Sequence, residues 1–367
     1  MSIHKEVVNK KDQQLDQSAK GSLVTRQFQM ESTVPSTTSL NNIINPNKTN
    51  ITEALCEFRE VWVSAHPVFI FAYSLVFLIS LVLNCITMKV YFCTKQRVQS
   101  SVTIYLKNLA AADFFLCLSL PLRIANNVNF SMTLRIIYCS FGATAFYLNM
   151  YASILFMDFI AANRYLKIVR SLETNAFQTV RTAHLISIAT WFFLVIMGSI
   201  YLIPFLQISW DHNQSSEDIS CESLHSAQHS LAYKIIHCAS IALFMLVLFS
   251  LVFLYWKTLQ KIREAKFSTQ ATSNSQTFNK SKRNMLILVV IFCVCFVPYH
   301  LVRLPYVFIS DCTMVQAFSI LKELTVLLSV LNVCFDPLIY LIFCKTFRAQ
   351  LGLGKKNELS RAVSLTP

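Results

Sequence analysis

The amino-acid sequence predicts an all-α integral membrane protein, a bundle of seven transmembrane helices followed by a short amphipathic helix. Hydrophobic residues make up 54% of the 367 and charged residues only 14%, whereas soluble domains carry about a quarter charged residues. Seven apolar runs are long enough to cross a ~30 Å hydrocarbon layer as helices and too long for barrel strands. They cover about residues 67–92, 102–126, 136–162, 183–207, 231–256, 285–309 and 316–343.

The distribution of basic residues predicts how these helices are oriented. The net charge is +13, but the lysines and arginines gather after the first, third, fifth and seventh runs. This positive-inside bias places the amino terminus outside and the carboxy terminus in the cytoplasm, and it assigns the basic clusters to topology and membrane-lipid contact rather than to nucleic acid. The clusters are Lys95 with Arg97, Lys167 with Arg170 and Arg181, the lysines and arginines between Lys257 and Arg283, and those between Lys345 and Lys356.

The segments that flank the bundle are predicted from composition. Residues 1–60 are rich in Ser, Thr, Asn, Gln and Lys, which is typical of a disordered tail. They lack the apolar core of a cleavable signal peptide, so the first run is expected to act as the signal. Residues 61–344 form the predicted transmembrane domain and 345–367 the amphipathic helix and cytoplasmic tail. Four glycosylation sequons fall on the predicted outside, at Asn47, Asn50, Asn129 and Asn213.

Four of the twelve cysteines lie at or near the predicted outer face, and an even number there favours disulfides. Cys139 opens the third run and Cys221 lies in the loop after the fourth, so a bridge between them would hold that loop over the bundle. Cys56 and Cys312 would join the tail to the last outer loop. The other eight cysteines lie in or beside helices and are interpreted as packing residues.

The sixth and seventh runs carry the most informative polar residues. His300 and Arg303 share one helical face, and Pro298 bends the helix below them. A cation deep in an apolar span is costly and is rarely kept without a partner. Lys322 opens the seventh run, where the proposed Cys312 loop would hold it facing Arg303. Two converging cations predict a site for an anion.

Tyrosines near these cations offer surfaces on which a ring could stack. Tyr147 and Tyr151 lie on the third run and Tyr306 lies above the arginine, so the set suits a phosphorylated ligand with a planar group. The alternative is that the arginine reaches the outer interface, that the lysine pairs with its neighbour Glu323, and that the tyrosines are packing residues.

The seven runs carry a set of polar, aromatic and proline residues whose order and spacing resemble those of a rhodopsin-like (class A) G-protein-coupled receptor over about residues 56–350. The resemblance is carried by Asn84, Leu109 to Asp113, Asn163-Arg164-Tyr165, Trp191, Tyr255, Phe296-Val297-Pro298, and Asn332 to Tyr340. It implies activation-switch roles for Asn163, Arg164, Tyr255, Phe296, Pro298, Asp336, Pro337 and Tyr340. The family usually has an aspartate where Asn163 stands. Because an amide forms no ion pair with Arg164, we expect raised basal signalling.

The resemblance also implies a polar cluster between the helices. Its members are Asn84, Asp113, Ser153, Asn332 and Asp336. Two acids near hydroxyl and amide oxygens suit a sodium ion, which the family often binds there, and no other cofactor is expected. The alternative is a hydrogen-bonded water cluster linking the helices. Asp158 is a further intramembrane acid to which we assign no role.

Within this family, the outer residues are similar to those of the purinergic nucleotide receptors for ADP and UDP-sugars. In that subgroup the positions matching Tyr147, His300, Arg303, Tyr306 and Lys322 line the nucleotide pocket. His225 stands where a loop lysine is expected, and Asn163 resembles the platelet-activating-factor receptor. A receptor for a lysophospholipid or a platelet-activating-factor-like lipid is therefore the alternative, with the lipid tail between the third and fifth helices.

The expected function is that of a plasma-membrane receptor for an extracellular anionic ligand, signalling through heterotrimeric G proteins of the inhibitory class. Arrestin and receptor kinases are further expected partners, with phosphorylation sites at Ser360, Ser364 and Thr366. A transporter is a remote alternative, because no internal repeat is visible and only five glycines are present. An enzyme is not expected, because the histidines are scattered and no nucleophile or metal cluster is apparent.

Overall fold

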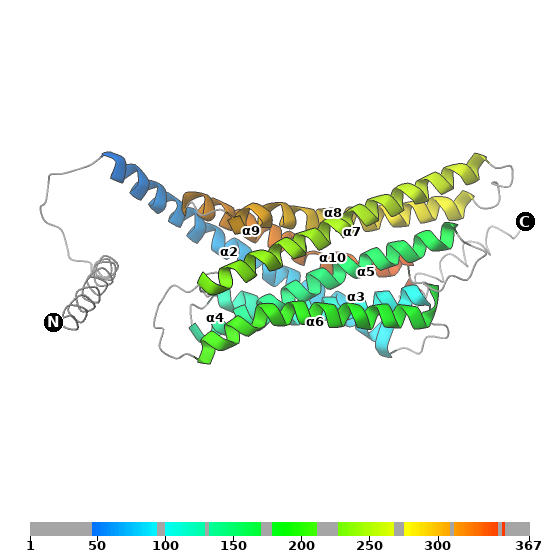
Figure 1. Cartoon of the computed structure of the whole chain (residues 1–367), viewed down its shortest axis with the longest axis horizontal. Coiled ribbons are helices and arrows are strands. Elements are labelled where there is room, and N and C mark those ends of the chain that lie inside the picture. The colour runs from blue at the N-terminus through cyan, green and yellow to red at the C-terminus, as the bar shows by residue number, and fades with distance from the viewer. Residues whose placement is uncertain are drawn as a thin grey trace, which may run out of the picture. The chain divides into compact units, whose positions relative to one another are not determined.

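The computed structural model describes residues 46–93, 100–128, 132–169, 178–210, 227–267, 275–308, 312–343 and 347–348. All secondary structure within these ranges is helical (Figure 1). In the same ranges, seven helices are long and apolar enough to cross a membrane: His66–Cys93, Ser101–Val128, Tyr138–Ile168, Val180–Ile200, Lys234–Glu264, Lys282–Phe308 and Ala317–Phe343. Each overlaps one predicted run, so the all-α, seven-helix fold class is confirmed.

The helices follow one another with short interruptions inside the spans. The first span is α2 (Pro46–Met88), which ends in the π-helical turn η1 (Lys89–Cys93). The second span is α3 (Ser101–Val128), and the third span follows from α4 (Met132–Ile137) through η2 (Tyr138–Gly142) and α5 (Ala143–Val169). The fourth, fifth and sixth spans are α6 (Val180–Trp210), α7 (Ala227–Phe267) and α8 (Ser275–Phe308). The seventh consists of α9 (Cys312–Val330) and α10 (Asn332–Phe343).

The chain divides into two units, residues 1–54 and 55–367, and the second contains the bundle. In the first unit the structure describes only the beginning of α2. This helix starts at Pro46, inside the tail that composition predicts to be disordered. Residues 53–60 read Glu-Ala-Leu-Cys-Glu-Phe-Arg-Glu, and most of these are good helix formers. The composition averaged over residues 1–60 does not show this local helix preference.

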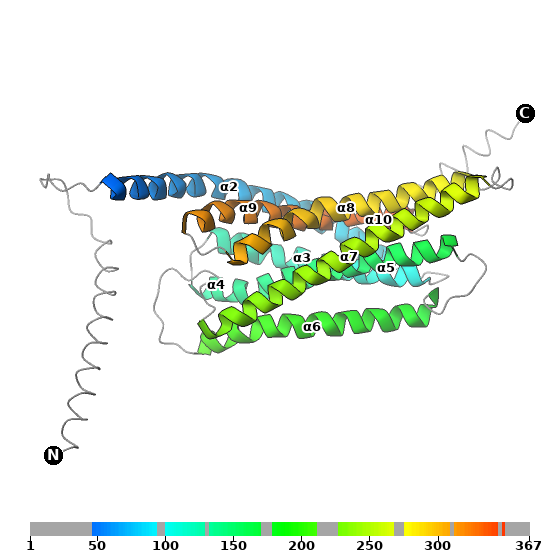
Figure 2. The same cartoon turned by 45° about the horizontal axis from the view of Figure 1, so that its top comes forward.

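The third span is the centre of the bundle. Its most apolar window is 61% buried, against 22% for the windows of α6 and α7. α5 packs against α3, α6 and α7, and α8 packs against α7 and α9. In both views α6 runs alongside α3 and α5 (Figures 1 and 2). The large apolar side chains that α6 exposes, such as Leu185 and Phe192, therefore face the predicted lipid.

Two prolines lie next to polar contacts that join the helices. Pro337 has no N–H to donate to the carbonyl of Val333, and Asn84 Nδ2 of α2 donates to that oxygen at 3.2 Å. In the turn before Pro298, the backbone oxygen of Cys295 accepts a hydrogen bond from Ser329 Oγ of α9 at 3.0 Å. These bonds tie the sixth and seventh spans to their neighbours where the helices are least regular.

Candidate functional site

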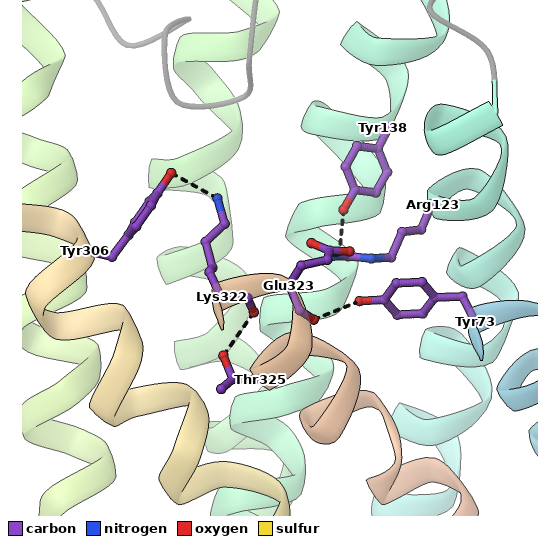
Figure 3. Close-up of polar contacts among 7 residues, drawn as sticks. All are labelled: Tyr73, Arg123, Tyr138, Tyr306, Lys322, Glu323 and Thr325. Carbon is purple, nitrogen blue, oxygen red and sulfur yellow. Dashed lines mark hydrogen bonds and ion pairs between the residues drawn. The ribbon is translucent and has the colours of Figure 1, made fainter. Parts of the chain in front are cut away.

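Two cations meet one tyrosine ring near the predicted outer end of the bundle. Arg303 of α8 is only 4% exposed, and its guanidinium carbon lies 5.5 Å from the centre of the Tyr306 ring. Lys322 Nζ of α9 lies 4.3 Å from the same centre and donates to Tyr306 Oη at 3.1 Å (Figure 3). Because an aromatic face attracts cations, the ring holds both positive charges on neighbouring helices. Three predicted ligand-binding residues are thus brought together.

Arg303 also contacts a histidine on α7. Its Nη2 lies 3.2 Å from His237 Nε2, and both side chains are buried. Because a guanidinium only donates hydrogen bonds, His237 must accept through Nε2 and is therefore neutral in this contact. Sequence reasoning did not assign His237 to the site. One signal in the sequence was a polar side chain within the fifth apolar run.

His300 lies in an aromatic stack of the core. Its Nδ1 lies 2.8 Å from the backbone oxygen of Phe296, so Nδ1 carries the proton and Nε2 accepts from Tyr151 Oη at 3.2 Å. Its ring stacks on Phe244, with centroids 3.8 Å apart and planes 3° apart. Both ring nitrogens are satisfied, so this arrangement fits a packing role for His300 better than a direct ligand contact.

The structure adds an ion pair that sequence reasoning missed. Arg123 Nη2 of α3 lies 2.7 and 2.9 Å from the two carboxylate oxygens of Glu323 on α9, and Nη1 donates to Tyr138 Oη at 2.7 Å. Figure 3 shows Glu323 directed toward Arg123, and Lys322 toward Tyr306. The signal was present in the sequence, because Arg123, like Arg303, is a cation within an apolar run.

A cavity opens between α5, α6 and α7. Its volume is about 50 Å³. Its walls are formed by Thr144, Tyr147, Leu148, Tyr151, Leu194, Met197, Gly198, Ile236, His237 and Ser240. Two of the predicted ligand-binding tyrosines thus line it, and Arg303 borders it through its bond to His237. The combination of a mainly apolar wall with a nearby cation suits an amphiphilic ligand.

A second polar cluster lies between the helices. Asp113 and Asp336 are fully buried, and Tyr340 Oη donates to Asp113 Oδ2 at 2.7 Å. Within the described part of the chain, several side-chain oxygens here have no hydrogen-bond partner: Asn84 Oδ1, Asp113 Oδ1, Asn149 Oδ1, Ser153 Oγ, Asn332 Oδ1 and both oxygens of Asp336. Buried polar atoms rarely stay unsatisfied. Carboxylate, amide and hydroxyl oxygens are the ligands that hard cations prefer, so this set fits a sodium ion.

The residues at the opposite end of the bundle hold Arg164 against α10. Arg164 Nη2 donates to the backbone oxygen of Phe343 at 3.0 Å, and its guanidinium carbon lies 4.8 Å from the Phe343 ring. A cation at a helix carboxyl end interacts favourably with the free carbonyls. Arg348 acts similarly, donating to Leu341 and Ile342. Asn163 Nδ2 instead donates to Ser101 Oγ of α3 at 3.0 Å.

The other predicted switch residues lie in several places. Phe296 is fully buried and contacts Phe292 edge-on at 5.4 Å. Tyr255 packs at the edge of the core. Tyr340 donates a hydrogen bond to Asp113 of α3. Pro298 and Pro337 lie inside α8 and α10.

The predicted disulfides and sequons fall mostly outside what the structure describes. Cys139 of η2 is disulfide-bonded, but Cys221 lies outside the described residues, so its identity as the partner stays a prediction. The side chains of Cys56 and Cys312, and those of Asn47 and Asn50 in α2, are likewise not described. Asn129, Asn213, His225 and almost all of the predicted amphipathic helix also lie outside the described ranges. The described free cysteines are Cys85, Cys93, Cys117, Cys238, Cys293, Cys295 and Cys334.

Comparison with known proteins gives one consistent family. Residues 83–340 match the family described as 7 transmembrane receptor (rhodopsin family). The chain is 30% identical to purinoceptor 14 of Bos taurus over 285 residues, which are 76% of this chain and 82% of that protein. It is 29% identical to G-protein coupled receptor 87 of Mus musculus over 299 residues, 80% and 81% of the two chains. The chain is 29% identical to probable G-protein coupled receptor 34 of Pan troglodytes over 282 residues, which are 76% of this chain and 72% of that protein.

Proposed function

Because the chain belongs to the rhodopsin family of seven-transmembrane receptors, we propose that this G-protein-coupled receptor responds to an extracellular phosphate-bearing ligand of the nucleotide or nucleotide-sugar type. The proposal places the receptor in the plasma membrane with its amino terminus outside. The name of the related purinoceptor 14 supports a nucleotide-like ligand. The family branch that the sequence resembles favours inhibitory G proteins.

The observation that carries the proposal is the pair of cations on the Tyr306 ring. A phosphate between Arg303 and Lys322 would be gripped by a planar fork on one side and a point charge on the other. Arg303 is buried and Lys322 is half-buried, so an anion between them is attracted more strongly than in water. A base or sugar ring would then lie toward Tyr147.

Ligand binding would signal by joining the outer ends of α8 and α9. Pro298 and the break at Leu331 between α9 and α10 provide the bends about which the two spans can move. Movement of α10 would release Arg164 from Phe343 and open the other end of the bundle to the G protein. The ligand can shift this equilibrium only by binding the active arrangement more tightly.

A second candidate, a lysophospholipid or platelet-activating-factor-like lipid, is favoured by the cavity between α5, α6 and α7. Its wall includes Leu148, Leu194, Met197 and Ile236, which suit an acyl chain. Arg303, joined to the wall through His237, would bind the phosphate of the headgroup. Both candidate ligands carry a phosphate, and they differ in the group attached to it, which is a base or sugar in one and an acyl chain in the other.

The two candidates are separated by a screen of G-protein activation in cells that express the receptor. The panel contains ADP, UDP, UDP-glucose, lysophosphatidic acid, lysophosphatidylserine and platelet-activating factor, with adenosine and oleic acid as matched compounds lacking phosphate. We expect activation by a nucleotide or nucleotide sugar and none by the compounds without phosphate. Activation only by the lipids would favour the second candidate, and activation by adenosine or oleic acid alone would overturn the phosphate requirement.

We also propose that sodium occupies the cluster of unpartnered oxygens around Asp113 and Asp336. It would be held by Asn84, Ser153 and Asn332 together with the two carboxylates, and would compensate their charge in the bundle interior. The alternative is a hydrogen-bonded water cluster that links the helices.

A further inference from the structure

Two adjacent residues of opposite charge at the start of the seventh span are directed to different partners. Successive residues of an α-helix lie about 100° apart around its axis, so Lys322 and Glu323 can face different neighbours. Lys322 donates to Tyr306 on α8, and Glu323 pairs with Arg123 on α3 (Figure 3). The two charges are nevertheless close enough to interact.

The ion pair of Glu323 is largely withdrawn from solvent. The side chains of Arg123 and Glu323 are 13% and 16% exposed, and the guanidinium contacts both carboxylate oxygens. Removing one partner of such a pair leaves the other charge in an environment where it is poorly solvated. Without Arg123, the carboxylate would be compensated at the expense of the cation next to it in the chain, Lys322.

Arg123 is itself held in place from two other helical segments. Its guanidinium carbon lies 4.7 Å from the centre of the Tyr73 ring of α2, and Nη1 donates to Tyr138 of η2. The Tyr138 ring lies where a larger residue at position 142 would clash, because a Cβ on Gly142 would come within 2.6 Å of Tyr138 Cδ2. The orientation of Arg123 toward Glu323 is therefore fixed by the surrounding fold.

We propose that Arg123 is a positioning residue for ligand recognition: by pairing with Glu323, it keeps that carboxylate from competing with the phosphate of the ligand for Lys322. Arg123 acts through Glu323 and does not itself contact the ligand. The inference rests on the proposed function, in which Lys322 binds that phosphate. It deepens the proposal by explaining how a cation site can function beside a carboxylate.

The electrostatic part can be tested without any ligand. Lys322→Cys places a thiol at the site, and its rates of modification by an anionic and a cationic methanethiosulfonate report the local potential. Adding Arg123→Gln should lower the anionic-to-cationic rate ratio at least about fivefold, because Glu323 is then unneutralised. Adding Glu323→Gln as well should restore the ratio. The unmutated receptor gives the background from native cysteines, and surface expression is measured for each variant.

A ratio that Arg123→Gln leaves unchanged would overturn the proposal, as would a lowered ratio that Glu323→Gln fails to restore. If Arg123→Gln does not reach the cell surface, the double variant decides instead. Because the pair of Arg123 and Glu323 carries no net charge, removing both charges should leave the ratio within about twofold of that of Lys322→Cys alone. A double variant at least about fivefold below Lys322→Cys alone would contradict the proposal.

The consequence for recognition is tested with whichever of ADP, UDP, UDP-glucose or lysophosphatidic acid activates the unmutated receptor. Arg123→Gln should weaken its potency about tenfold or more, and Arg123→Gln with Glu323→Gln should recover to within about threefold. A double variant as weak as Arg123→Gln would mean that Arg123 binds the ligand directly, and the positioning role would be wrong. If none of these compounds activates the receptor, the proposed function fails, while the modification rates still decide the role of Arg123.

Discussion

Asn163 and Arg164 have different partners at the predicted cytoplasmic end of the third span. Its amide donates to Ser101, while Arg164 is held by the terminal carbonyl and ring of Phe343. Asn163 and Arg164 thus contact two other helices, α3 and α10. The inactive arrangement depends on how firmly α10 retains the arginine.

Asn163→Asp should lower basal G-protein activation about two- to fivefold. The added carboxylate can pair with Arg164, and a partly exposed ion pair contributes up to about 1 kcal/mol to the inactive arrangement. The measurement is ligand-free nucleotide exchange on the G protein at matched surface expression, with Asn163→Ala as the control that removes the amide without adding charge. Unchanged basal activity in Asn163→Asp would contradict this account of the switch.

Asp113 provides a second test at the scale of single residues. If sodium occupies the oxygens left unpartnered in this arrangement, replacing choline chloride by sodium chloride should lower basal activity and agonist affinity, because an ion that binds one arrangement stabilises it. Asp113→Asn should abolish this dependence. Asp158→Asn is the matched control, since Asp158 is an intramembrane acid of α5 outside the cluster. Sodium dependence that survives in Asp113→Asn would mean that sodium acts outside the cluster, and no dependence in the unmutated receptor would favour the water cluster.

At the scale of the helices, the sequence predicted every membrane span, because runs of apolar residues report directly on the hydrocarbon layer. It also indicated the cations, because charge in such a run is conspicuous. It could not show which partner each cation takes. Glu323 is next to Lys322 in the chain but pairs with Arg123, and His300 follows the face of Arg303 but stacks on Phe244. Pairing and stacking depend on helix rotation and packing, which periodicity does not determine.

A substitution of Gly198 on α6 tests whether the part of the ligand beyond the phosphate lies in the cavity between α5, α6 and α7. A Cβ there would lie 3.1 Å from Leu148 Cδ2, so Gly198→Val should fill part of the cavity between α5, α6 and α7. We expect the potency of a lysophospholipid to fall about tenfold or more and that of a nucleotide to change little. Ser199→Val, at the next position but outside the cavity wall, is the control. Equal loss for both compound classes would mean that the substitution distorts the bundle.

For the molecule as a whole, the two ends are connected by the sixth and seventh spans. Arg303 and Lys322 lie at one end of these spans, and Arg164 holds the last residue of α10 at the other. Between them, Ser329 joins α9 to α8, and Asn84 and Tyr340 join α10 to α2 and α3. A change in the distance between α8 and α9 therefore has a continuous set of contacts through which to reach the G-protein end.

The central claim is that Arg303 and Lys322 together bind the phosphate of an extracellular ligand. The most direct measurement is the potency of the activating compound on Arg303→Ala, on Lys322→Ala and on the double variant, at matched surface expression. Lys234→Ala, which removes an exposed lysine of α7, is the control. Each single variant should lose about tenfold or more, since a charged hydrogen bond contributes about 1.5–3 kcal/mol, and the double variant should not respond. A double variant that reaches the surface and responds normally would contradict the claim.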